Sequence, residues 1–225
     1  MPVAPNARAT ADGLTAPRIF IAPHQAGVAL TEKVAPRNVR SVSDQTRRLV
    51  DLLRRHSVQR GSFTLASGRT SSLYVDARLT TMHPEGLAII GPLALSRLLA
   101  AQLYPDSVGG LTLGADPVSY AIAYASASSG RPVRAFTVRK EPKAHGTGRL
   151  IEGPFRSTDR VVVVEDVITT GGSALRAITT VRAAGATVIA VLAVVDREEG
   201  GRDAIAAAGV PVLSLATASD LTEPL

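Results

Sequence analysis

The sequence contains no cysteine and no tryptophan among its 225 residues, and its aromatic residues are four Phe and four Tyr. The absence of cysteine excludes disulfides, thiolate metal sites and cysteine nucleophiles. Modules that stack nucleic-acid bases rely on aromatic-rich motifs, which this chain lacks, so we expect no nucleic-acid partner. No hydrophobic run approaches the roughly 18 residues that a membrane-spanning helix needs. We therefore expect no membrane partner and a cytoplasmic location.

Lysine is scarce: beside 22 arginines, the chain has only Lys33, Lys140 and Lys143. The formal net charge is +6, and half of it lies in residues 1–40, which hold five basic and two acidic groups. The rest of the charge is too evenly mixed to form the basic stripe of a nucleic-acid-binding surface. Two of the three lysines fall in one short segment, which makes that segment a candidate for function.

Residues 1–42 contain five prolines and no sustained hydrophobic periodicity. Prolines interrupt helices and strands, so we interpret this segment as a flexible N-terminal extension. With 45% apolar residues, the chain can bury a sizeable core, and its length suits one domain plus an appendage. Residues 43–225 are predicted to form that domain.

Hydrophobic spacing in the first part of the domain predicts a helix, two short strands that suggest a small hood, and a second, longer helix. The polar pair Ser43-Asp44 offers an N-cap for the first helix, and a proline stands in the first turn of the second. The predicted elements are the helix 43–56, the strands 62–65 and 73–77, and the helix 84–103.

The rest of the domain alternates short apolar runs with helical segments, a pattern typical of an α/β fold with a parallel sheet. Residues 161–164 and 188–195 are continuously apolar, which indicates central strands covered on both faces. The polar segment 140–154 is longer than most connections in such folds, and loops of this length are often functional. The predicted strands are 110–113, 133–138, 161–164, 187–195 and 210–215, and the predicted helices are 117–126, 173–184 and 203–208.

The most informative stretch is 161–174, where an apolar strand leads to two acidic residues, a Thr-Thr-Gly-Gly turn and a helix. Ligands of open parallel sheets bind beyond the carboxyl ends of the strands, where Glu165 and Asp166 are expected to emerge. Small residues let backbone N–H groups approach an anion, and the helix N-terminus adds its positive dipole end. The pattern therefore predicts a phosphate site, to which the hydroxyls of the turn add further donors.

Two other phosphate-binding patterns are absent from the sequence. The chain has no Gly-x-x-x-x-Gly-Lys-Ser/Thr, which disfavours a P-loop ATPase, and no Gly-x-Gly-x-x-Gly after a strand, which disfavours a dinucleotide-binding fold. A single Gly-Gly pair would usually be a plain turn before a helix capped by Ser173. The complete string of fourteen residues at 161–174 instead resembles the phosphoribosyl pyrophosphate signature of type I phosphoribosyltransferases.

This resemblance implies a type I phosphoribosyltransferase-like parallel sheet flanked by helices, with a small N-terminal hood and a flexible catalytic loop. It assigns the ribose hydroxyls to the acidic pair and the 5′-phosphate to the turn at 169–173. Magnesium (Mg²⁺) is implied too, held by pyrophosphate, ribose and water rather than directly by the protein. The residues of this stretch that are implied to bind phosphoribosyl pyrophosphate are Glu165, Asp166, Val167, Ile168, Thr169, Thr170, Gly171, Gly172 and Ser173.

A cationic segment at 139–148 reads Arg-Lys-Glu-Pro-Lys-Ala-His-Gly-Thr-Gly. A departing diphosphate accumulates negative charge, and positive donors aimed at it lower the barrier. Most charged loops are merely solvated, but a phosphosugar diphosphate needs a second, cationic site. The segment resembles the catalytic loop of orotate phosphoribosyltransferases, which implies contacts to the diphosphate from Arg139, Lys140, Lys143 and His145.

Two further stretches carry the same resemblance. Residues 63–71 are similar to the family's hood, after which Tyr74 would lie near the base. Residues 195–200 are similar to its Asp-Arg-x-Glu-x-Gly segment, where Arg197 would pair with the orotate carboxylate through a guanidinium whose planar fork matches it. The residues implied to bind orotate are thus Tyr74, Thr169 and Arg197.

The residues and the resemblance together predict a magnesium-dependent orotate phosphoribosyltransferase of de novo pyrimidine synthesis, with Lys143, His145 and Asp166 as candidate catalytic residues. The family's loop closes over the neighbouring subunit's site, which implies a homodimer with shared active sites. The chain departs from the pattern at Ala66 and Val118, where many bacterial members have lysine. Two alternatives stay open: a phosphoribosyltransferase for another base, and a non-catalytic phosphoribosyl pyrophosphate sensor that regulates transcription.

Overall fold

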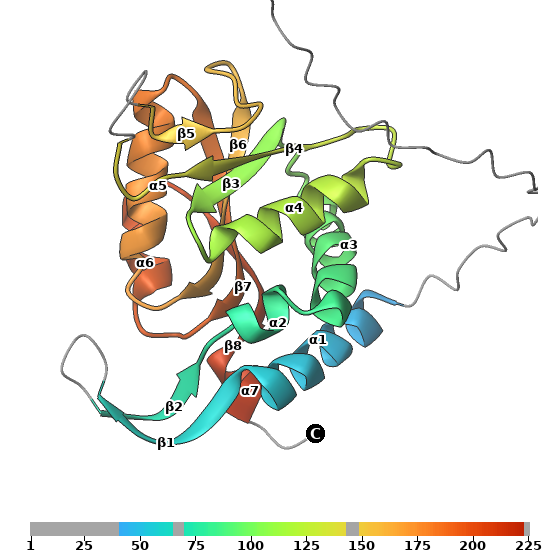
Figure 1. Cartoon of the computed structure of the whole chain (residues 1–225), viewed down its shortest axis with the longest axis vertical. Coiled ribbons are helices and arrows are strands. Elements are labelled where there is room, and N and C mark those ends of the chain that lie inside the picture. The colour runs from blue at the N-terminus through green and yellow to red at the C-terminus, as the bar shows by residue number, and fades with distance from the viewer. Residues whose placement is uncertain (1–40, 65–69, 143–148, 223–225) are drawn as a thin grey trace, which may run out of the picture. The chain divides into compact units, whose positions relative to one another are not determined.

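A six-stranded sheet in the order β5-β4-β3-β6-β7-β8 forms the centre of the protein (Figure 1). The structure is a computed structural model that describes residues 41–64, 70–142 and 149–222. Neighbouring strands run parallel, except that the short β5 is antiparallel to β4. The predicted α/β class with a parallel sheet is therefore confirmed. The strands are β3 (Ser107–Leu111), β4 (Arg134–Val138), β5 (Ile151–Glu152), β6 (Arg160–Ile168), β7 (Thr187–Asp196) and β8 (Val212–Thr217).

The order of the strands reverses between β3 and β6. From β3 the chain proceeds outward to β4 and β5, whereas from β6 it proceeds in the other direction to β7 and β8. The connections that leave β3 and β6 therefore diverge, and a crevice forms at the carboxyl ends of these two strands. Open α/β sheets bind their ligands at such a point, so the turns after β3 and β6 frame the expected site.

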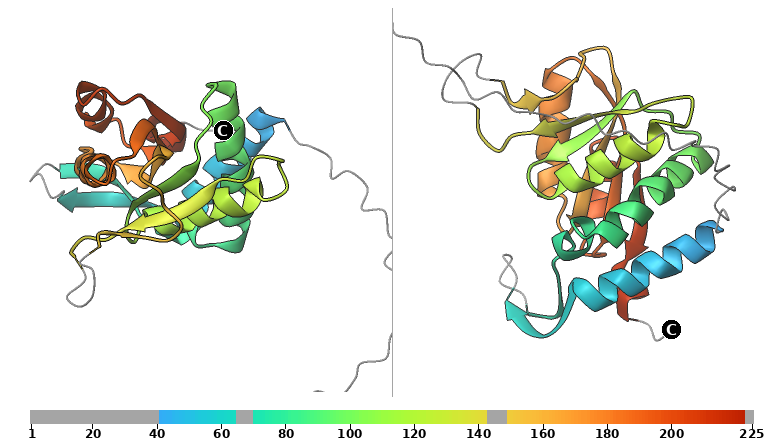
Figure 2. Two further views of the ribbon diagram at one scale, coloured as in Figure 1. Left: turned by 90° about the horizontal axis from the view of Figure 1, so that it is seen from above. Right: turned by 45° about the vertical axis from the view of Figure 1, so that its right-hand side comes forward.

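Helices cover both faces of the sheet (Figures 1 and 2). α3 and α4 pack on one face, and α5 and α6 pack on the other. Valines of β6 alternate between these layers, with 162 and 164 in the core under α3 and α4 and 161 and 163 in the core under α5. The helices are α1 (Val42–His56), α2 (Arg78–Thr81), α3 (Pro84–Ala100), α4 (Ala115–Ser126), α5 (Gly172–Ala183), α6 (Gly201–Ala207) and α7 (Ala218–Thr222).

The predicted hood is a separate two-stranded antiparallel sheet of β1 (Val58–Thr64) and β2 (Thr70–Val75). These strands extend away from the central sheet at the lower left of Figure 1. The preceding helix α1 packs on α3 through buried leucines, among them Leu49 and Leu53. Because α1 leads directly into β1, the hood is anchored to the face of the sheet that α3 covers.

Several boundaries differ from the predictions. The N-cap of α1 is Ser41, whose hydroxyl accepts a hydrogen bond from the Asp44 N–H, so Ser43 lies inside the helix. β3 begins and ends earlier than predicted, because the chain turns at residues 112–114. β6 extends four residues beyond the predicted end at 164, because it stays paired with β7 as far as Ile168.

Three short elements, α2, β5 and α7, were not predicted, because two to five residues carry too little periodicity to be recognised. β5 lies within the segment that was predicted to be a loop, 140–154. The predicted flexible extension falls almost entirely outside the described residues, so it stays a prediction. None of the helices within the described ranges is long and apolar enough to cross a membrane.

Candidate active site

The predicted acidic pair lies inside β6, beside the crevice. Successive residues of a strand point to opposite faces, so Glu165 faces the layer of α5 and Asp166 faces the layer of α3 and α4. Glu165 lines a cavity of about 360 Å³ at the start of α5, whereas the Asp166 carboxylate lies against Gly114 in the turn after β3. The prediction that the pair emerges after the strand was wrong, because pairing with β7 continues past both residues.

Glu165 is a buried carboxyl group whose Oε1 has no hydrogen-bond partner in the described part of the chain. The residue is 4% exposed. Burial raises its pKa to about 8, and the charge of Asp166 adds to the increase. Buried polar groups are usually hydrogen-bonded, and carboxyl groups with strongly shifted pKa values are common at functional sites. Glu165 is therefore a candidate for binding the hydroxyl groups of a ligand.

The Asp166 carboxylate is held on two sides. Its Oδ1 accepts a hydrogen bond of 2.9 Å from the Val167 N–H, and burial raises its pKa. On the other side the carboxylate packs on the backbone of Gly114, where a Cβ atom would lie 2.3 Å from Oδ1. Only glycine allows this approach, so the turn after β3 and the Asp166 carboxylate together form one wall of the crevice.

The predicted phosphate turn, residues 169–173, leads from β6 into α5, which begins at Gly172. Thr169 and Thr170 are exposed, and Gly171 adopts a φ of +82°, a left-handed conformation that glycine reaches without strain. Gly171 is also the N-cap of α5, so the unpaired N–H groups of a twelve-residue helix border the 360 Å³ cavity. Backbone donors and a positive helix end at one cavity suit an anion such as phosphate.

The phosphate turn packs directly against the loop after β7. A Cβ atom at Gly201 would lie 2.3 Å from the Thr169 carbonyl oxygen, and one at Gly171 would lie 2.9 Å from the Gly201 carbonyl oxygen. The Arg197 N–H also donates a hydrogen bond of 2.9 Å to the Ile168 carbonyl oxygen. The two loops are therefore in backbone contact, which larger residues at these glycines would prevent.

A further carboxylate, Asp116, organises the turn after β3. It is 9% exposed, and its two oxygens accept hydrogen bonds of 2.7 Å from the hydroxyls of Thr112 and Thr137. The hydroxyl of Tyr120 lies 3.2 Å from that of Thr137. These bonds tie the first turns of α4 to the ends of β3 and β4, and so hold the turn that faces the acidic pair.

Arg197 connects the hood with the end of β7. Its Nη2 donates to the Leu73 carbonyl oxygen of β2 at 3.0 Å and to Glu199 Oε1 at 2.8 Å. The residue is only 7% exposed, so these bonds form largely away from water. Tyr74 follows Leu73 in β2, is partly exposed, and its ring centre lies 5.4 Å from that of Phe63. Arg197 therefore contacts the strand that carries Tyr74, as expected for two residues of one site.

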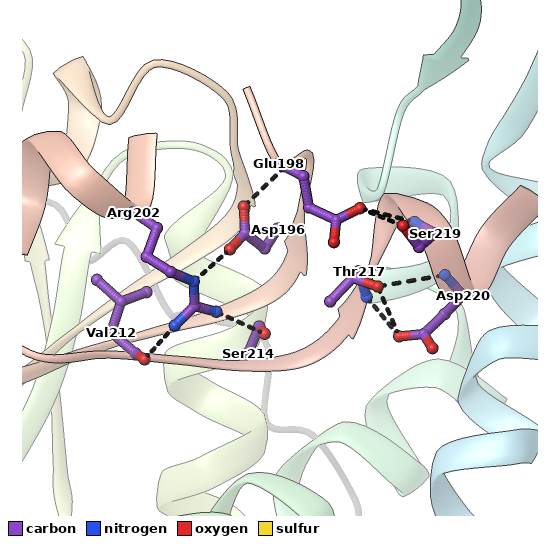
Figure 3. Close-up of polar contacts among 8 residues, drawn as sticks. All are labelled: Asp196, Glu198, Arg202, Val212, Ser214, Thr217, Ser219 and Asp220. Carbon is purple, nitrogen blue, oxygen red and sulfur yellow. Dashed lines mark hydrogen bonds and ion pairs between the residues drawn. The ribbon is translucent and has the colours of Figure 1, made fainter. Parts of the chain in front are cut away.

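A network of polar contacts braces the loop that carries Arg197 (Figure 3). Asp196 is 1% exposed and accepts from Arg202 Nε and from the Glu198 N–H, both at 2.9 Å. Glu198 adopts a φ of +57°, which is uncommon for a residue with a side chain. Its Oε2 accepts from the N–H and the hydroxyl of Ser219, at the start of α7. Residues of both α6 and α7 therefore form hydrogen bonds that hold the loop in place.

The chain is similar to proteins of known function and structure, although no family model matches it. It is 50% identical over 159 residues to the orotate phosphoribosyltransferase of Aquifex aeolicus, covering 71% of this chain and 86% of that protein. The crystal structure of Mycobacterium tuberculosis orotate phosphoribosyltransferase in complex with 5-phospho-α-D-ribosyl 1-diphosphate is 44% identical, with a TM-score of 0.65, covering 80% of this chain and 99% of that chain. The chain belongs to the orotate phosphoribosyltransferase family.

In this orotate phosphoribosyltransferase family member, most of the residues singled out by the sequence lie at one end of the sheet. The acidic pair and the phosphate turn border the crevice, and Arg197 adjoins the phosphate turn through the Ile168 carbonyl oxygen. Arg139 and Lys140 follow β4, the neighbour of β3. Lys143 and His145 lie outside the described residues, so their diphosphate contacts stay predictions.

Arg139 and Lys140, at the described end of the cationic segment, form hydrogen bonds and an ion pair with neighbouring segments. The Arg139 N–H donates to the Leu150 carbonyl oxygen at 2.8 Å, and its guanidinium lies 3.6 Å from the Glu152 carboxylate. The Lys140 carbonyl oxygen accepts a hydrogen bond of 2.9 Å from Arg176 Nη2 in α5. Arg176 also lines the 360 Å³ cavity at the start of α5, so it joins the cationic segment to that cavity.

Several residues at the candidate site of this orotate phosphoribosyltransferase family member were not predicted from the sequence. Asp116 follows a predicted strand just as the acidic pair does, and that signal could have identified it. Arg176 stands one turn into the helix after the phosphate turn, where a cation can reach a phosphate. The contacts of Gly114 and Gly201 leave no sequence signal, because they depend on atoms from other segments.

Proposed function

We propose that the protein transfers phosphoribosyl from phosphoribosyl pyrophosphate to N1 of orotate, giving orotidine monophosphate and pyrophosphate in de novo pyrimidine synthesis. One observation carries this proposal: an acidic pair on β6, one residue buried and one partly buried, adjoins a glycine turn at the N-terminus of α5, where the strand order reverses. A sugar that carries a phosphate complements such a site, because the carboxyl groups accept from hydroxyls and the turn donates to an anion. The substrate complex of the Mycobacterium tuberculosis relative supports this choice.

The reaction exchanges one bond at C1 of the ribose. The C1–O bond breaks and its electron pair leaves with the diphosphate, while orotate N1, having lost its proton, supplies the pair for the new C1–N bond. Positive charge develops on the ribose ring in between. With the 5′-phosphate in the turn and the ribose hydroxyls on Glu165 and Asp166, the Asp166 carboxylate lies beside that charge and lowers the barrier. The step needs no covalent nucleophile.

Orotate would be held at the hood side of the crevice by Tyr74, Thr169 and Arg197. A guanidinium presents five N–H donors in one plane, so Arg197 can bind Glu199 and a substrate carboxylate at the same time. The network around Asp196 keeps the loop rigid, which lets the guanidinium select a carboxylate by position rather than by charge alone.

The carboxyl oxygens at the crevice fit a magnesium ion that arrives with the substrate. Mg²⁺ keeps several waters and is usually bound through one or two carboxylates together with substrate phosphates. Within the described ranges, no group of three or more His, Cys, Asp or Glu could hold a metal by itself. The Asp166 carboxylate and the unpartnered Oε1 of Glu165 are suitable oxygens beside a diphosphate and a ribose. When bound, the ion would neutralise charge on the diphosphate.

The cationic segment would bind the diphosphate through Arg139, Lys140, Lys143 and His145 and close over the site of the partner in a homodimer. Replacing Lys143 with alanine should therefore lower kcat about tenfold, since one positive donor to the leaving group is lost. Thermal stability should stay the same, because a polar segment flanked by glycines contributes little packing. Steady-state kinetics and thermal unfolding of Lys143→Ala measure both, and near-normal turnover would contradict the assignment.

Glu165 gives the protein a predictable pH dependence of stability. Its pKa is about 8 in the folded protein against an ordinary value of 4.5. Between these values the folded state binds a proton that the unfolded state has lost, so the free energy of unfolding should fall as the pH rises from 4.5 to about 8 and then level off. Denaturant titrations across this range measure the slope. Glu165→Gln should remove most of it, and an identical slope in that variant would refute the burial argument.

An assay with a panel of bases separates the proposal from its alternatives. The purified protein is incubated with phosphoribosyl pyrophosphate, Mg²⁺ and one base at a time, and orotate absorbance and pyrophosphate release are followed. Consumption of orotate with release of pyrophosphate is the expected result. Turnover of another base alone would identify a different phosphoribosyltransferase, and binding of phosphoribosyl pyrophosphate without turnover of any base would identify a sensor.

A further inference from the structure

Arg78 stands at the start of α2, where the chain returns from the hood to the central sheet. Its guanidinium binds the Asp76 carboxylate through two bonds, Nε to Oδ1 at 2.8 Å and Nη2 to Oδ2 at 2.9 Å. Its Nη1 has no hydrogen-bond partner in the part of the chain that the structure describes. Because the side chain is 47% exposed, the pair orients the guanidinium without burying it.

The guanidinium of Arg78 lies close enough to Asp166 to interact with its charge, and it borders the turn after β3. Arg78 lines a cavity of about 440 Å³ that also includes Leu113 of that turn. The hydrogen bond and the charge of Asp76 raise the pKa of Arg78, and Asp166 and Tyr74 add to the increase. Arg78 is thus a permanent cation placed between the hood and β6.

The positions of Glu165 and Asp166 on opposite faces of β6 determine how a bound substrate would be oriented. The phosphate turn and Glu165 form the cavity on the α5 side, whereas Asp166 faces the opposite side, toward Gly114 and Arg78. A ribose that rests on both carboxyl groups with its 5′-phosphate in the turn must point C1 and the diphosphate toward the turn after β3. That turn and the first residues of α4, residues 112–118, contain one aspartate and no cation.

Arg197 and Arg176, at the same end of the sheet, lie nearer to other parts of the proposed substrate. Arg197 is bonded to Glu199, and Arg176 donates to the Lys140 carbonyl oxygen on the side of the 5′-phosphate. We propose that Arg78 binds the diphosphate of phosphoribosyl pyrophosphate, with Asp76 holding its guanidinium in the binding orientation. This inference rests on the proposed function and adds a substrate-binding residue, outside the motifs recognised in the sequence, to that same site.

The test compares Arg78→Ala with Arg55→Ala, a change of an exposed arginine on α1 far along the chain from the crevice. Two probes are titrated by calorimetry in the presence of Mg²⁺: phosphoribosyl pyrophosphate, and ribose 5-phosphate, which has the same 5′-phosphate but no diphosphate. Arg78→Ala should weaken binding of phosphoribosyl pyrophosphate about tenfold to a hundredfold, as expected for a lost charged hydrogen bond. Binding of ribose 5-phosphate should be unchanged, and Arg55→Ala should affect neither probe.

A second variant distinguishes a substrate contact from a purely structural ion pair. Asp76→Asn removes the ion pair but keeps an oxygen acceptor beside the guanidinium, so Arg78 stays available to the diphosphate. We expect its loss of phosphoribosyl pyrophosphate affinity to be clearly smaller than that of Arg78→Ala. Equal losses in these two variants, or equal weakening of both probes by Arg78→Ala, would overturn the proposal.

The same measurements separate this inference from the function on which it rests. If the wild-type protein neither binds phosphoribosyl pyrophosphate nor converts orotate, the proposed function fails. If the wild-type protein does both and Arg78→Ala binds phosphoribosyl pyrophosphate normally, only the role of Arg78 is refuted. Partial recovery of affinity in Arg78→Lys, which keeps the charge but not the planar fork, would support the contact.

Discussion

Replacing Asp166 with asparagine should lower kcat/KM about a hundredfold to a thousandfold, because the variant lacks a negative charge beside the developing positive charge of the ribose. The geometry of the strand should survive, since asparagine can still accept the hydrogen bond from the Val167 N–H. Stability should be unchanged or higher. Burial raises the pKa of Asp166, so the folded protein already disfavours the charged form that the substitution removes.

Steady-state kinetics with both substrates, together with denaturant unfolding, measure these two effects of Asp166→Asn. Asp203→Asn is a matched control, because Asp203 is an exposed aspartate on α6. That control should retain the kcat/KM and the stability of the wild type. A kcat/KM close to normal in Asp166→Asn would refute the assignment of the ribose hydroxyls to β6.

The two adjacent glycines of the phosphate turn should respond to alanine in opposite ways. At Gly171 a side chain meets a φ of +82° and the Gly201 carbonyl oxygen at 2.9 Å, so Gly171→Ala must shift the turn. A displacement of about 1 Å at a reacting site can cost on the order of a hundredfold, and we expect such a loss of kcat/KM. The strained backbone should also lower the free energy of unfolding by about 1–3 kcal/mol.

At Gly172, by contrast, the nearest atom to an added Cβ is Thr170 Oγ1, at 4.0 Å, and the backbone is helical. Gly172→Ala should therefore raise the free energy of unfolding by about 0.5–1 kcal/mol, since alanine loses less backbone entropy in a helix than glycine does. Its activity should be retained. Unfolding titrations and kinetics of the two variants side by side provide the measurement, and equal effects of both changes would show that the turn does not depend on the conformation of Gly171.

The candidate phosphate site could be located from the sequence because its features are contained in one short segment. A strand, two acidic residues, a glycine turn and a helix follow one another within residues 161–174, and each feature is visible in the sequence. The parallel sheet was predictable for a similar reason, since strands buried on both faces are continuously apolar. If the predicted strand had included Glu165 and Asp166, the alternation of side chains along a strand would also have placed them on opposite faces of the sheet.

The remaining parts of the site depend on contacts between distant segments. Arg197 donates to a carbonyl oxygen 124 residues earlier in the chain, at Leu73, and Asp116 accepts from Thr137 in a different strand. Nothing in the sequence around these residues specifies the partner. Arg78 was overlooked because a four-residue helix has no periodic signal, and its ion pair with Asp76 resembles an ordinary surface contact until the fold places it beside Asp166.

The backbone contact between Gly201 and the phosphate turn has a consequence for the spacing of the two loops. Because the two loops touch and share the hydrogen bond from Arg197 to Ile168, neither loop can shift without disturbing the backbone of the other. Under the proposed assignments, this contact fixes the distance between the guanidinium that binds the orotate carboxylate and the turn that binds the 5′-phosphate.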